Sequence, residues 1–88
     1  MIHKSATRAC EITWNNGNVT TLWLGHNRST GEAIVWQVVR WNGKLGKSTR
    51  LTGRNITKLV AEMARYVNAD GRYTYRSDAA MAQIGALL

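Results

Sequence analysis

Basic side chains are concentrated in the middle of the chain. Between Glu32 and Glu62 there are six lysines and arginines, half of the chain's total, and no acidic residue. A surface adapted only for solubility usually mixes both signs of charge. Ammonium groups suit phosphates, and arginine forks suit phosphates and guanine edges. The segment therefore indicates a polyanion or an acidic protein surface as the partner. The alternative is an ordinary solvated hairpin, in which the same charges keep a sheet edge from aggregating.

We take eight residues of this segment as candidates for binding nucleic acid. They are Gln37, Arg40, Trp41, Lys44, Lys47, Arg50, Arg54 and Lys58. The lysines and Arg54 are expected to contact phosphates, whereas Arg50, Gln37 and Trp41 are expected to lie nearer the bases.

A hairpin must position most of these residues. Asn42-Gly43 lies between two runs of alternating side chains, residues 34–41 and 44–51. Asn and Gly are the residues that best tolerate the positive φ angles of a type I′ turn, so the pattern predicts a two-residue hairpin loop. Trp41 should then pair with Lys44.

The same register predicts the two faces of the hairpin. Its outward face should carry Val35, Gln37, Val39, Trp41, Lys44, Gly46, Ser48 and Arg50. Its core face should carry Ile34, Trp36, Val38, Leu45 and Leu51, interspersed with Arg40, Lys47 and Thr49. A shift of one residue in the register would exchange the two faces.

A helix is predicted after the hairpin, over residues 56–67, with Asn55 as its N-cap. Apolar residues recur at helical spacing and form one stripe. They are Ile56, Leu59, Val60, Met63, Ala64 and Val67. The polar side carries Thr57, Lys58, Glu62 and Arg65.

The flanking segments complete the expected fold. Residues 10–14 and 19–24 surround an Asn-rich turn with Gly17 and predict a first hairpin. Asp70-Gly71 is expected to supply the left-handed residue that ends the helix, and residues 72–76 alternate like a short edge strand. Ser77 is a predicted N-cap for a helix over residues 78–87, with Met81, Ile84 and Leu88 on one face.

We therefore expect one α+β domain spanning residues 1–88, in which an antiparallel sheet of about four strands packs on one amphipathic helix, plus a short C-terminal helix.

The second hairpin and its helix resemble a known family of DNA-binding domains. A strand at residues 35–41, the Asn-Gly turn, a basic strand, a Thr-Gly break and a helix at Ile56 are similar to the arm-type, AP2-like domains found ahead of tyrosine recombinases. The resemblance covers about residues 33–67, and the N-terminal hairpin is additional. In that family the sheet enters the major groove, so the resemblance implies DNA, favoured over RNA, as the partner.

Composition limits the other classes of function. The net charge is +7 over 88 residues, and the single cysteine, Cys10, has no partner within the chain for a disulfide. Cys and His residues do not have zinc-ligand spacing, so neither a metal nor a cofactor is expected. The first residues lack the apolar core of a signal peptide, and no run has membrane-spanning length. We expect a cytoplasmic monomer or homodimer without membrane contact.

Two alternatives remain open alongside nucleic-acid binding. Small basic domains also act as phage-type inhibitors of host nucleic-acid-handling complexes, as anti-CRISPR proteins do. A small basic ribonuclease toxin is the other alternative, with His26 near Arg28 as its best acid/base pair, but the scarcity of paired catalytic residues favours a protein that is not an enzyme. The tryptophans could stack on unpaired bases, yet we expect Trp36 and one tryptophan of the first hairpin to be buried and Trp41 to be exposed.

Overall fold

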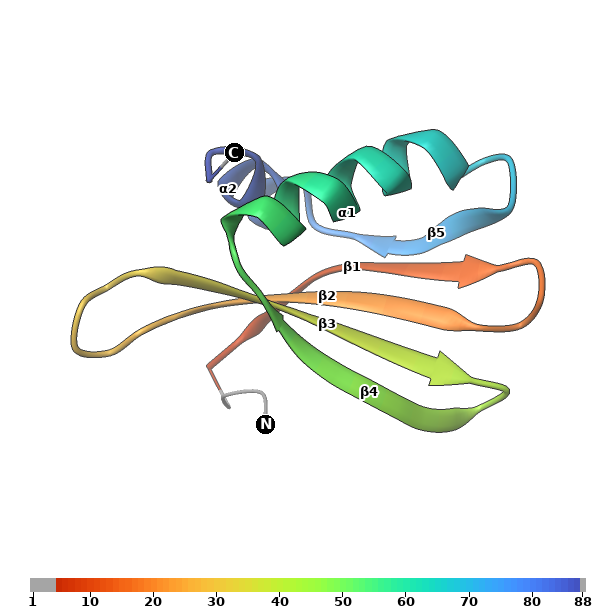
Figure 1. Cartoon of the computed structure of the whole chain (residues 1–88), viewed down its shortest axis with the longest axis horizontal. Helices are drawn as coiled ribbons and strands as arrows, with labels where there is room; N and C mark the ends of the chain where they lie inside the picture. The colour runs from red at the N-terminus through yellow and green to blue at the C-terminus, as the bar shows by residue number, and fades with distance from the viewer. Residues whose placement is uncertain (1–4, 88) are drawn as a thin grey trace.

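The chain folds into an antiparallel sheet with two helices on one of its sides (Figure 1). The computed structural model describes residues 5–87. Its elements are β1 (Thr7–Trp14), β2 (Val19–His26), β3 (Ala33–Trp41), β4 (Lys44–Leu51), α1 (Gly53–Tyr66), β5 (Gly71–Arg76) and α2 (Asp78–Gly85). The strand order is β4-β3-β2-β1-β5. The predicted α+β class is confirmed, and the sheet has five strands because β5 pairs with β1 at the edge opposite β4.

The turn of the second hairpin forms as predicted. Asn42 and Gly43 have φ angles of 51° and 79°, which are the positive values of a type I′ turn. Trp41 pairs with Lys44, as the sequence predicts.

The hairpin departs from the predicted register beyond a β-bulge. The register shifts between Val38 and Arg40, so that Gly46 and Lys47 together lie opposite Val39. From there on, Gln37 pairs with Thr49 and not with Ser48. The alternation of side chains could not reveal the extra residue, because a bulge adds one position to a single strand without changing the turn.

The predicted faces of β3 are wrong. Val35 has no exposed surface and packs in the core beside Leu24 and Leu51, its partners on the neighbouring strands. Trp36 therefore points to the other side of the sheet, because successive side chains of a strand alternate between faces. The sequence did not discriminate between the faces because β3 has apolar side chains on both of them.

Helix α1 covers the core face of the sheet. Ile56, Met63 and Val67 are buried against the strands, Leu59 and Val60 are partly buried, and Ala64 is exposed, contrary to prediction.

The ends of α1 also differ from the expectation. Thr52 is the N-cap in place of Asn55, since its carbonyl accepts a hydrogen bond from the Ile56 amide at 2.9 Å. After α1, Asn68 takes the left-handed conformation, with φ at 80°, that was predicted for Asp70-Gly71. Gly71 instead begins β5.

Helix α2 closes one end of the core. The Ser77 side chain accepts a hydrogen bond from the Ala80 amide at 3.3 Å, which confirms the predicted cap. Ala80 and Ile84 are buried, and Met81 packs against the same cluster, whereas Leu88 lies outside the described residues. Within residues 5–87, no helix is long and apolar enough to cross a membrane.

Candidate nucleic-acid interface

The eight predicted residues do not share one surface. Gln37 lies on the helix side of the sheet, where it lines a groove of about 200 Å³ with Leu59 and Lys58 of α1. Its predicted position on the outward face is therefore wrong, because Gln37 shares a face of β3 with Val35, and Val35 is buried on the helix side.

The other predicted residues lie on several parts of the molecule. Arg40 and Arg50 point away from the helices, at paired positions opposite Leu45 and Trp36. Trp41 and Lys44 flank the hairpin turn, Lys47 lies in the bulge, and Arg54 and Lys58 are exposed on α1.

The tryptophans are only partly as predicted. Trp41 is 51% exposed, which confirms the expectation. All four tryptophans lie among the described residues and none is fully buried, so the expectation of a buried Trp36 is wrong. Trp14 of the first hairpin packs against the core, and its Nε1 donates to Thr20 Oγ1 at 2.8 Å.

The sheet surface away from the helices, here called the open face, carries a row of four side chains. Arg8, Trp23, Trp36 and Arg50 occupy successive paired positions from β1 to β4. Their chain neighbours Leu24, Val35 and Leu51 point into the core, which places Trp23, Trp36 and Arg50 on the opposite side. In this row two tryptophans are thus flanked by two arginines.

A glycine shapes the position of one ring. An ideal Cβ at Gly25 would lie 2.7 Å from Cζ3 and 3.1 Å from Cη2 of Trp36. The Trp36 ring therefore lies over Gly25, on the space that a larger residue would occupy. Trp23 is the residue directly paired with Trp36, so the two tryptophans are neighbours on the open face.

A hollow of about 290 Å³ lies beside this row. Its lining residues are Arg8, Glu11, Thr21, Trp23, Val38, Arg40 and Leu45. Thr21 and Val38 are buried and form its floor, whereas Leu45 is 68% exposed at its rim. The hollow combines an aromatic wall, two arginines and one carboxylate.

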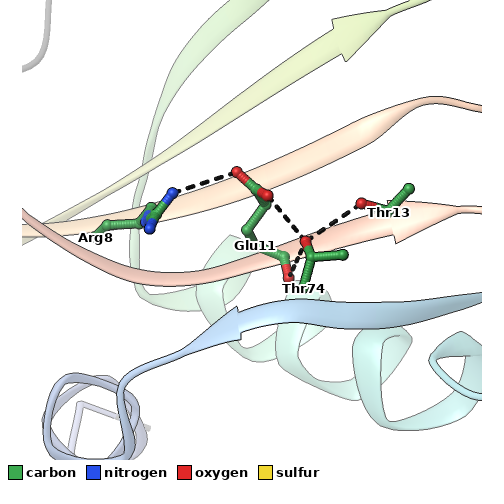
Figure 2. Close-up of polar contacts among 4 residues, drawn as sticks. All are labelled: Arg8, Glu11, Thr13 and Thr74. Carbon is green, nitrogen blue, oxygen red and sulfur yellow. Dashed lines mark hydrogen bonds and ion pairs between the residues drawn. The ribbon is translucent and has the colours of Figure 1, made fainter.

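Polar contacts between β1 and β5 hold that carboxylate (Figure 2). Arg8 Nη1 donates to Glu11 Oε2 at 3.5 Å, and the Thr74 hydroxyl lies 2.9 Å from Glu11 Oε1. Thr13 Oγ1 donates to Thr74 Oγ1 at 3.2 Å. The guanidinium carbon of Arg8 lies 4.1 Å from the centroid of the Tyr75 ring. Both Arg8 and Glu11 are therefore oriented by neighbours on two strands.

Sequence reasoning missed the half of the open face that comes from outside the second hairpin. Arg8, Glu11 and Trp23 belong to the first hairpin, and Arg72 of β5 pairs with Thr13 on the same face. The alternation of Val19, Thr21 and Trp23 along β2 was a usable indication, because it places these side chains on one face.

The cysteine and the described histidine lie apart from the open face. Cys10 is fully buried, and this burial raises the pKa of its thiol to about 11, so the thiolate is not available near neutral pH. His26 is exposed at the end of β2. Among residues 5–87, no three His, Cys, Asp or Glu side chains gather as metal ligands.

Comparisons of the chain with protein-family models, with curated proteins and with solved structures found no match. The resemblance to AP2-like DNA-binding domains therefore stays a prediction.

Proposed function

We propose that this protein binds single-stranded nucleic acid on the open face of its sheet. The observation that carries the proposal is the row Arg8–Trp23–Trp36–Arg50, in which two paired tryptophans are flanked by two arginines. Aromatic side chains on a sheet stack on unpaired bases, and each such contact contributes about 1–3 kcal/mol with little dependence on sequence.

Charge on the open face supports the same partner. Arg8, Arg40, Arg50 and Arg72 occupy its paired positions, and arginine forks bind phosphate oxygens in bidentate fashion. The overall charge of +7 would draw a polyanion to the protein before specific contacts form.

A single strand suits this face better than a duplex. The major groove of B-DNA admits a helix or a two-stranded ribbon, whereas the rings of Trp23 and Trp36 lie within a sheet that is five strands wide. In a duplex the faces of the bases are already stacked on one another, so rings lying in a broad surface would have no base face to contact. We therefore propose a single strand in place of the duplex DNA that the second hairpin alone led us to expect.

The test is a titration of labelled single-stranded DNA, single-stranded RNA and duplex DNA against the protein. If Arg8, Arg40 and Arg50 neutralise three phosphates, log affinity for single strands should fall with log salt at a slope of about −2. Trp36→Ala should weaken binding about five- to hundredfold, which corresponds to one lost stacking contact.

Trp41→Ala is the matched control, because this exposed ring lies at the hairpin turn and away from the Trp23–Trp36 pair. It should change single-strand affinity less than about twofold. Absence of single-strand binding below about 10 µM at low salt, or an equal loss in the two tryptophan variants, would refute the proposal.

A further inference from the structure

An acidic residue lies in the middle of the surface proposed to bind a polyanion. Glu11 occupies the second row of the open face, paired with Thr21 on β2 and Tyr75 on β5. A carboxylate at this position repels phosphates and so opposes non-specific binding. The same carboxylate lines the hollow, where it could accept hydrogen bonds from a ligand.

The Glu11 carboxylate is held in place and retains acceptor capacity. Arg8 approaches Oε2 at 3.5 Å and Thr74 Oγ1 lies 2.9 Å from Oε1, so each oxygen has one partner (Figure 2). An ionised carboxylate offers about four lone-pair sites, which leaves one site free on each oxygen. One acceptor site on each oxygen therefore remains for a ligand.

We propose that the hollow receives one unpaired guanine base, whose Watson–Crick edge donates two hydrogen bonds to Glu11. The inference rests on the single-strand binding proposed above and adds a base preference to it. Guanine places its N1–H and N2–H donors side by side, which matches the two oxygens of a carboxylate. Adenine and cytosine place a ring-nitrogen acceptor beside their amino group, and that lone pair would face a carboxylate oxygen. Uracil and thymine offer one donor between two carbonyl groups.

The remaining lining of the hollow suits a base. Trp23 supplies an aromatic wall for stacking, and the buried Thr21 and Val38 form its floor. Arg40 lies at the same hollow, where it can bind the phosphate of the nucleotide. A volume of about 290 Å³ is at the small end of the range for ligand pockets, which fits a single base and not a folded oligonucleotide.

The test uses nine-residue oligothymidylates that carry one central guanine, inosine, adenine or thymine. Inosine lacks the exocyclic amino group and so isolates one of the two proposed hydrogen bonds. The guanine oligonucleotide should bind about tenfold more tightly than the adenine one, with inosine between them.

Glu11→Gln should reduce the guanine-to-adenine ratio to about one, because an amide offers one acceptor and one donor. Its affinity for the all-thymine strand should stay equal or rise, since a repulsive charge is removed. Glu32→Gln is the matched control: it makes the same charge change in the exposed β2–β3 connection, outside the residues that line the hollow. It should leave the ratio at about ten, and the unfolding temperatures of both variants establish that they are folded.

The outcomes separate the two proposals. Equal binding of all four oligonucleotides, or a guanine preference that survives in Glu11→Gln, would overturn the guanine site and leave the single-strand function standing. Absence of binding to every oligonucleotide would overturn both.

Discussion

Gly25→Ala tests whether the Trp36 ring lies on the open face as described. The new Cβ would come 2.7 Å from Trp36 Cζ3, whereas non-bonded carbons prefer about 3.5–4.0 Å. The ring must therefore move by about 1 Å. Gly25 is not among the described residues with positive φ, so alanine fits its backbone and the effect comes from the ring.

The size of the effect follows from the exposure of Trp36. Overpacking costs about 1–3 kcal/mol in a closed core, and a half-buried ring that can lift toward solvent should cost about 1 kcal/mol. For a domain of this size, that corresponds to a decrease in the unfolding temperature of about 4–8 °C. A lifted ring would also stack less well, so single-strand affinity should fall severalfold.

Thermal unfolding followed by circular dichroism, together with the oligonucleotide titration, measures both effects. Gly53→Ala is the control, because a Cβ in this first turn of α1 would meet no described atom within 4 Å. It should raise stability by about 0.4–1 kcal/mol and leave binding unchanged. Wild-type stability and affinity in Gly25→Ala would show that the Trp36 ring does not rest on Gly25.

Two further predictions concern the core. Met63→Ala should destabilise the fold by about 2–5 kcal/mol, because the Met63 side chain of α1 is only 3% exposed. Leu59→Ala should cost less, because Leu59 is only partly buried. Urea unfolding measures both free energies, and the opposite order would contradict the described packing of α1. Burial raises the pKa of Cys10 from 9.0 to about 11, so the unfolded chain releases this proton first as the pH rises. The protonated Cys10 thiol should therefore make its full contribution to the free energy of unfolding below about pH 9. Between pH 9 and 11 that free energy should fall by about 1.4 kcal/mol per pH unit. Urea unfolding at pH 8, 9 and 10 measures this fall, which should be absent in Cys10→Ala. If the variant shows the same pH dependence as the wild type, the buried thiol is not the source of the fall.

Local features of the fold were predictable from the sequence. The Asn42-Gly43 turn and the Ser77 cap formed as expected, because both depend on the φ angles and hydrogen bonds of residues a few positions apart. The limits of β4 were predicted to the residue. The first residue of α1 was not predicted correctly, since Thr52 and Asn55 are both acceptable N-caps and the choice depends on how the helix meets the sheet.

The candidate site was less accessible from the sequence. Gln37 was expected on the outward face and Arg40 on the core face, yet the burial of Val35 puts Gln37 on the helix side and Arg40 on the open face. A strand with apolar side chains on both sides gives no periodic indication of which side meets a helix. The side is decided by tertiary packing, in which Val35 is buried with Leu24 and Leu51 of the neighbouring strands.

The sequence by itself determined that this protein is strongly basic, rich in tryptophan and built from hairpins followed by a helix. Only the tertiary structure decided which arginines lie in the same row of the sheet as which tryptophans. Arg8 and Arg50 are distant along the chain, but the strand order β4-β3-β2-β1-β5 puts them in one row with Trp23 and Trp36. Glu11 meets Thr74 for the same reason, because the pairing of β1 with β5 brings residues 7–14 beside residues 71–76. Such pairings are set by the burial of the opposite face, where the apolar side chains of all these strands leave water together.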